Sequence, residues 1–85
     1  MTTRLLFFGS LREKAGGAER IVEIPRRVDT IASLVDWIAA DDDMLKAALL
    51  APLVRVAVDQ EIMVDRKEPL RPAEEVAFMP PFSGG

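Results

Sequence analysis

The residues of this sequence that could do chemistry stand together at its C-terminal end, in the run Met79-Pro80-Pro81-Phe82-Ser83-Gly84-Gly85. Neither proline can donate a backbone hydrogen bond, so the pair ends strand pairing and favours an extended polyproline II exit. From Pro80 the terminal carboxylate can then reach roughly 18–20 Å beyond the sheet. Because Gly84 and Gly85 carry no side chain, such a tail suits a narrow channel that leads to another protein's active site.

The chemistry that this tail favours is activation of the Gly85 carboxylate. A carboxylate is a poor electrophile until one of its oxygens becomes part of a leaving group, as in a mixed anhydride with AMP. The activated carbonyl of a terminal glycine is flanked only by a methylene, so a nucleophile can approach it freely. A glycine end can also be no more than a disordered tail. Its position directly after a strand and two prolines favours a carrier instead.

The composition excludes most other chemistry. The 85 residues include no Cys, His or Tyr, which excludes disulfides, Cys–His zinc sites and Ser–His or Cys–His nucleophile pairs. The net charge of −3 argues against nucleic acid, whose binding depends on Lys and Arg. No apolar run approaches the length of a membrane span, so we expect no membrane interaction and a cytoplasmic location. The acidic run 41–43 is interpreted as a solvated turn that caps the next helix, rather than as a metal site.

The elements that must position the tail are predicted from hydrophobic periodicity and from capping signals. A capping box at Ser10 and Glu13 predicts a short helix that ends at Gly16-Gly17. The main helix begins at Asp29 or Thr30, with an apolar stripe that packs on a sheet. The stripe of the main helix consists of Ile31, Leu34, Val35 and Ile38, with Trp37 at its rim. A second short helix is predicted at 44–50. The predicted strands are 4–8, 20–24, 54–58, 62–64 and 75–79.

These elements predict one small α+β domain, residues 1–79, that carries an extended tail, residues 80–85. A mixed sheet of about five strands has the main helix packed on one face. We expect the first and last strands to pair in parallel at the centre of this sheet.

The first strand is apolar on both faces, in the run Leu5-Leu6-Phe7-Phe8, although one helix covers only one face of a sheet. Part of the other face, formed by this strand with Ala57, Ala77 and Met79, is therefore a candidate docking patch. The alternative is that the connecting loops and the helix 44–50 cover this face. The pattern alone leaves both interpretations open.

Three stretches of the chain carry a family resemblance. In residues 6–16 an aromatic strand end precedes Leu-Arg-Glu and a glycine, and Val56-Ala57-Val58 precedes a turn. The most specific stretch is residues 75–85, which ends Pro-Pro-Phe-Ser-Gly-Gly. Together they resemble the small subunit of molybdopterin synthase, the MoaD family of ubiquitin-like β-grasp sulfur carriers. The chain departs from the family at Asp59, where Asn is usual, and at Ala73-Glu74, where Gly-Asp is usual; both positions lie in predicted turns, whose geometry these changes could alter.

The resemblance implies a ubiquitin-like β-grasp fold and a role in molybdenum cofactor biosynthesis. An adenylating enzyme of the ubiquitin-activating type consumes ATP to adenylate Gly85, and a sulfur donor converts the adenylate to a thiocarboxylate. The tail, with Gly84 as its second bare residue, then enters the large subunit of molybdopterin synthase in a two-plus-two heterotetramer and passes sulfur to a pterin precursor. By this resemblance the chain is not an enzyme on its own and binds no cofactor tightly. The implied docking residues are Phe8, Met79, Pro80, Pro81, Phe82 and Ser83.

Two other functions remain open at this stage. One is a sulfur carrier for thiamine thiazole synthesis or for tRNA thiolation, although thiamine carriers are typically shorter and lack Pro-Pro before the tail. The other is a non-catalytic β-grasp binding module whose Gly-Gly end is incidental.

Overall fold

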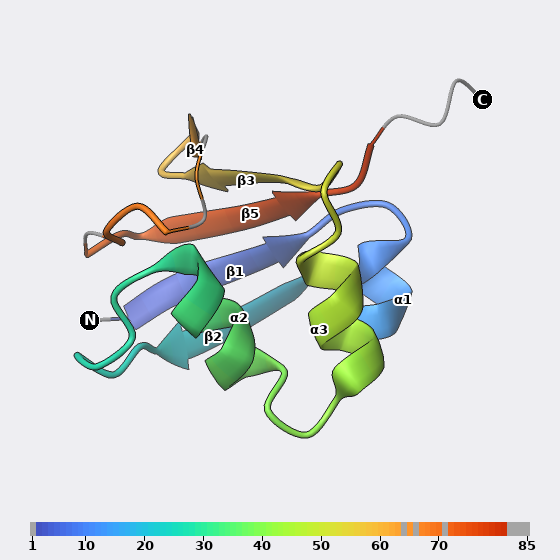
Figure 1. The fold of residues 1–85 in the computed structure, drawn as a ribbon, viewed down its shortest axis with the longest axis horizontal. Coiled ribbons are helices and arrows are strands. Elements are labelled where there is room, and N and C mark those ends of the chain that lie inside the picture. The colour runs from blue at the N-terminus through green and yellow to red at the C-terminus, as the bar shows by residue number, and fades with distance from the viewer. Residues whose placement is uncertain (1, 64, 66, 71, 82–85) are drawn as a thin grey trace.

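The central feature of the fold is a five-stranded sheet in the order β2-β1-β5-β3-β4 (Figure 1). The computed structural model describes residues 2–63, 65, 67–70 and 72–81. β1 and β5 pair in parallel at the centre, and the remaining neighbours pair antiparallel. The mixed sheet and its central parallel pair confirm the predicted β-grasp topology. The strands are β1 (Thr2–Phe7), β2 (Glu19–Glu23), β3 (Arg55–Val58), β4 (Glu61–Met63) and β5 (Glu75–Met79). Val64, the last residue of the predicted strand 62–64, lies outside the described residues.

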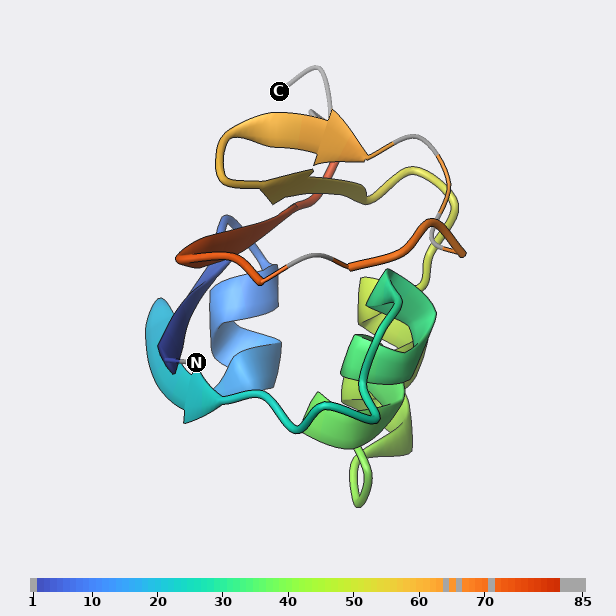
Figure 2. The same ribbon diagram turned by 90° about the vertical axis from the view of Figure 1, so that its left-hand side faces the viewer.

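The helices of the described residues lie together on one side of the curved sheet (Figure 2). They are α1 (Leu11–Ala15), α2 (Ile31–Ile38) and α3 (Asp43–Leu49). Each contributes buried leucine or isoleucine side chains to the same hydrophobic core as the sheet. No helix within the described ranges is long and apolar enough to cross a membrane.

The core confirms the stripe that was predicted for the main helix. Ile31, Leu34 and Val35 are fully buried, and Ile38 and Trp37 are half-buried side chains that pack against the core from its margin. On the sheet side, the core is built around the two central strands. Their buried residues are Leu5 and Phe7 of β1 with Val76 and Phe78 of β5, and the rings of Phe7 and Phe78 stack with centroids 5.6 Å apart and an interplanar angle of 8°.

The capping box predicted at Ser10 is wrong. Ser10 is already helical in conformation (φ −64°, ψ −18°), and its side chain makes no capping hydrogen bond. The physical reason is that backbone carbonyls of the preceding turn satisfy the first amides of α1: Leu11 N donates to Phe8 O (3.1 Å) and Arg12 N donates to Gly9 O (3.2 Å). The predicted end of this helix is confirmed, because Gly16 takes the left-handed conformation with φ 81°.

A reciprocal capping box does form, but at α2. Thr30 is the N-cap residue, and its Oγ1 accepts a hydrogen bond from Ser33 N (3.0 Å). The Ser33 hydroxyl in turn accepts from Thr30 N (2.9 Å). Two amides that the helix itself cannot satisfy are thereby paired.

We expect Thr30→Ala to lower the free energy of unfolding by about 0.5–2 kcal/mol. The matched control is Ser10→Ala, which should lower the free energy of unfolding by less than about 0.5 kcal/mol because no side-chain cap is lost there. Urea denaturation of the two variants measures both values. Equal losses in the two variants would contradict the side-chain cap at Thr30 and its absence at Ser10.

The acidic run 41–43 forms a turn and a cap, as predicted. Asp42 Oδ1 accepts a hydrogen bond from Leu45 N (2.9 Å) and so caps α3, whereas Asp41 and Asp43 are exposed. The run therefore has a structural explanation in the start of a helix.

The two positions at which the chain departs from the MoaD pattern contact each other. Asp59 and Gln60 form the two-residue loop of the β3–β4 hairpin, with φ of 49° and 71°, the positive values that a type I′ turn requires. Asp59 Oδ1 accepts hydrogen bonds from the amides of both Glu74 and Glu75 (3.0 Å each). The Asp59 side chain therefore ties this hairpin to the start of β5.

Candidate functional site: the tail exit and the open sheet face

The tail leaves the domain at the end of the central strand pair. Beyond the last paired residues of β1 and β5, Phe8 N still donates to Phe78 O (3.0 Å), so the two strands stay joined up to the exit. Met79 is the last residue of β5; Pro80 is half-buried and Pro81 is exposed. Strand pairing ends where the two prolines begin, as their missing amide protons require.

The predicted reactive residues lie outside the described residues. They are Gly84 and Gly85, together with the predicted docking residues Phe82 and Ser83. The four residues that follow Pro81 span at most roughly 13–14 Å when extended. Their roles stay predictions.

An apolar row crosses the face of the sheet that the helices leave open. Leu6 of β1 pairs in register with Ala77 of β5, which pairs with Ala57 of β3, which pairs with Ile62 of β4. Residues that alternate along a strand point to opposite faces, and the flanking residues Leu5, Phe7, Val56 and Phe78 belong to the core. The row therefore lies on the opposite face.

The structure answers one half of the question that the sequence left open, namely whether the helix 44–50 covers this face. The helix predicted at 44–50 is α3, and its Leu45 and Leu49 pack into the core on the other side of the sheet. It does not cover the row. Ala57 and Ala77 are only 6% and 5% exposed, but Ile62 at 48% and Phe8 at 46% present large apolar side chains to solvent. Phe8 and Met79, two of the predicted docking residues, thus lie at the exit end of an apolar face.

Charged residues occupy the other end of the same face. Arg4 of β1 pairs with Glu75 (3.0 Å) and with Glu19 (3.6 Å) across the neighbouring strands. These pairs are partly exposed and contribute little to stability. Their consequence is a gradient on the open face, from ion pairs near the start of β1 to apolar side chains near the tail exit.

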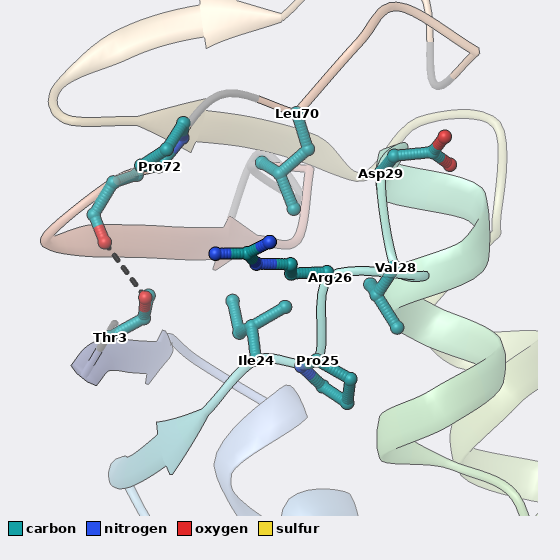
Figure 3. Close-up of a pocket in the computed structure, with 9 residues that line it drawn as sticks. Thr3, Ile24, Pro25, Arg26, Val28, Asp29, Leu70 and Pro72 are labelled. Carbon is teal, nitrogen blue, oxygen red and sulfur yellow. Dashed lines mark hydrogen bonds between the residues drawn. The ribbon is translucent and has the colours of Figure 1, made fainter.

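A pocket of about 390 Å³ lies at the opposite end of β1 and β5 from the exit (Figure 3). Apolar side chains such as Ile24 and Leu70 form most of its wall, and the Arg26 side chain extends across it. The Thr3 hydroxyl at its edge donates to Ala73 O (2.7 Å). Its lining also includes the Asp29 carboxylate, but the Thr3 hydroxyl is bonded to a backbone carbonyl and not to Asp29, so these described residues form no nucleophile–base pair.

Glu23, a carboxylate with a lowered pKa, lies close to that end of the sheet. Thr2 Oγ1 donates to the carboxylate of Glu23 (2.7 Å), which lowers the pKa of Glu23. Glu23 is in register with Thr2 at the start of β1, so this shift is remote from the tail exit and has no part in its chemistry.

Two residues of the candidate site were not singled out from the sequence. Ile62 joins the apolar row only through the register of β3 and β4, which the sequence pattern does not fix. Gly9 lies against Pro80: a Cβ atom placed on Gly9 would be 2.8 Å from Pro80 Cγ. A glycine after an aromatic strand end is a signal of close backbone approach, but its partner is far away in the sequence.

Comparison with known proteins agrees with this geometry. The ThiS family model matches residues 5–85. The molybdopterin synthase sulfur carrier subunit of Escherichia coli (strain K12) is 34% identical over 82 residues, which cover 96% of this chain and 98% of the relative. The resemblance inferred from the sequence is thereby confirmed.

Solved structures match the fold. SAMP1 from Haloferax volcanii superposes with a TM-score of 0.77 at 23% identity, over 100% of both chains. A chain in the complex of subunits 1 and 2 of the molybdopterin-converting factor from Helicobacter pylori 26695 gives a TM-score of 0.63 at 14% identity, again over 100% of both chains. The fold, the tail exit and the near-complete family match lead to one conclusion: this chain belongs to the ThiS family.

Proposed function

We propose that this protein is the sulfur carrier of molybdopterin synthase and that its working group is the carboxylate of Gly85. The observation that carries the proposal is the exit of the tail, through Pro80 and Pro81, from the central strand of the sheet and beside an apolar face on which Phe8 and Ile62 are exposed. Such a carrier needs a reactive end that is held away from the domain and a surface on which partners dock. The similarity to a sulfur carrier subunit over 96% of the chain supports the same assignment.

The proposed chemistry takes place at the end of the tail in partner active sites. A carboxylate oxygen of Gly85 attacks the α-phosphorus of ATP, and pyrophosphate leaves. Hydrosulfide supplied by a donor then attacks the acyl carbon, AMP leaves, the sulfur loses its proton, and the tail ends in a thiocarboxylate. Sulfur is more nucleophilic than the oxygen it replaces, so the loaded tail can attack a pterin precursor. Hydrolysis of the acyl–sulfur bond then leaves the sulfur on the precursor and returns the Gly85 carboxylate. The carrier supplies the sulfur and the docking surface, and its partners supply the catalytic side chains and the ATP site.

The proposed partners are an adenylating enzyme of the ubiquitin-activating type, a sulfur donor and the large subunit of molybdopterin synthase, all in the cytoplasm. The Helicobacter pylori relative in fold is one of two subunits in a protein–protein complex, which supports a large-subunit partner. On this proposal the chain is a subunit of a sulfurtransferase complex and not an enzyme alone. The apolar row with Phe8 and Met79 is the proposed docking face, because exposed apolar patches mark interaction sites.

The test of this function is an intact-mass measurement. The protein is incubated with the adenylating enzyme, ATP and sulfide, and it should gain the mass of one sulfur in place of one oxygen. The loaded protein is then mixed with the large subunit and the pterin precursor, and dithiolene formation is followed. Loading without dithiolene formation would assign the carrier to another thiolated product, such as thiamine thiazole or tRNA. Failure to load would leave the binding-module alternative.

Phe82 is expected to act as an aromatic anchor in the partner. Phe82→Ala should weaken binding to the large subunit by about 1–4 kcal/mol, because buried aromatic anchors carry most of the binding energy of an interface. Isothermal titration calorimetry measures this loss, and the melting temperature should stay nearly unchanged. A variant that binds normally but melts earlier would show that Phe82 belongs to the core of the domain.

A further inference from the structure

Gly9 and Pro80 are in direct contact at the root of the tail, although they are far apart in the sequence. Gly9 has a φ of +55°, and a Cβ atom on it would lie 2.8 Å from Pro80 Cγ and 3.6 Å from Pro80 Cδ. Carbon atoms that are not bonded prefer separations of about 3.5–4.0 Å. The Pro80 ring therefore occupies the space that any other residue at position 9 would need.

The turn that contains Gly9 is held on both sides. On the strand side, Phe8 N donates to Phe78 O (3.0 Å). On the helix side, the carbonyl of Gly9 accepts from Arg12 N (3.2 Å). Pro80, in contrast, follows the last paired residue of β5 and has no amide proton of its own. A side chain at position 9 would therefore displace Pro80 outward before it displaced the turn.

We propose that Gly9 is a positioning residue for the tail: its bare Cα is the surface on which the Pro80 ring rests, and this contact sets the direction in which the chain leaves β5. The proposal rests on the proposed function, in which the tail must place Gly85 in a partner's active site. Restoring an ordinary carbon–carbon separation requires Pro80 Cγ to move by about 0.7–1.2 Å. Misplacement of about 1 Å can cost on the order of a hundred-fold in rate.

The structure offers a matched control in Gly16. Its φ of +81° is also left-handed, but nothing lies within 4 Å of the position that a Cβ would take. Gly9→Ala and Gly16→Ala therefore impose the same kind of backbone strain, and only the first meets Pro80. Both variants should melt about 4–8 °C below the unaltered protein.

The first experiment measures pyrophosphate release by the adenylating enzyme with the carrier as the varied substrate. Gly9→Ala should lower kcat/KM by about ten- to a hundred-fold, and Gly16→Ala should leave it unchanged. On a Pro80→Ala background, which removes the Cγ and Cδ atoms of the ring, Gly9→Ala should have no further effect on kcat/KM. The proposal would be overturned if Gly9→Ala and Gly16→Ala had equal kcat/KM. It would also be overturned if Gly9→Ala lowered kcat/KM as much in the Pro80→Ala background as in the unaltered protein.

A second measurement needs no partner. The amide chemical shift of Phe82, the first residue with an amide proton after the two prolines, should change in Gly9→Ala and not in Gly16→Ala. If the unaltered protein supports no pyrophosphate release at all, the proposed function fails. The comparison of Phe82 amide shifts then still shows whether a side chain at position 9 displaces Pro80. If the unaltered protein is active and the Phe82 amide does not respond to Gly9→Ala, the positioning role alone is wrong.

Discussion

Protein that lacks Gly85 is expected to acquire no sulfur. Deletion leaves a carboxylate on Gly84 that is chemically competent, so the loss would be one of position. The tail becomes shorter by roughly 3.1–3.6 Å, whereas reacting groups tolerate displacements of only about 1 Å. The measurement is the intact mass after incubation with the adenylating enzyme, ATP and a sulfur source. The fold should be unaffected, because β5 ends at Met79 and the described core residues all precede the tail.

Two further variants separate position from chemistry. One extra residue after Gly85 should be as damaging as the deletion, because the carbonyl to be activated becomes an internal peptide bond. Gly84→Val keeps the length and the carboxylate but adds a branched side chain, which does not pass where a bare backbone fits. None of the three should gain sulfur. Dithiolene formation at the unaltered rate by the protein without Gly85 would remove the carrier function and leave a binding module.

Replacing Phe7 by Ala is expected to have the largest effect on stability, with a loss of about 3–5 kcal/mol in the free energy of unfolding. The Phe7 side chain is 1% exposed and stacks on Phe78 between the central strands and the helices. Its removal leaves a cavity at the centre of a small core, and a loss of this size is a large share of the stability of such a domain. Denaturation by guanidinium chloride, followed by the fluorescence of Trp37, measures the change.

The matched control is the next residue in the chain. Phe8 has the same side chain but is 46% exposed on the open face, so Phe8→Ala should change stability by no more than about 0.5 kcal/mol. It should instead weaken binding to the large subunit by about 1–4 kcal/mol. A Phe8→Ala variant that unfolds as readily as Phe7→Ala would show that the open face is part of the core. Normal partner binding by Phe8→Ala would remove this residue from the docking face.

Local patterns predicted most of the fold because they depend on neighbouring residues. The stripe of Ile31, Leu34 and Val35 follows from the helical period, and Gly16 follows from the left-handed conformation that ends a helix. The capping box at Ser10 failed for a reason that is also local but invisible in the pattern: carbonyls of the preceding turn had already paired the first amides of α1. A capping signature shows which side chain is able to accept a hydrogen bond from a helix amide. It does not show whether that amide already has another partner.

The candidate site was less predictable because it is assembled from distant segments. The strand patterns predicted an apolar patch of the first strand with Ala57, Ala77 and Met79, and the resemblance supplied the reactive tail. Strand register brought Ile62 into the row, and the parallel pairing of β1 with β5 brought Gly9 to Pro80. The parallel pair itself was expected from the sequence, but the exact register was not, because register depends on which residues form each turn and on packing across the whole domain.

The parallel pairing of β1 with β5 also governs when the domain can fold during its synthesis. β1 is made before the other four strands, but β5, its neighbour at the centre of the sheet, ends only at Met79. The hydrogen bond from Thr3 to Ala73 joins positions 70 residues apart. Closing so long a loop costs entropy that only the completed sheet repays. A nascent chain that stops short of β5 therefore lacks both the core and the continuous apolar row. Partners that recognise the open face would meet only chains whose synthesis has reached the root of the tail, so prematurely ended chains would not compete for them.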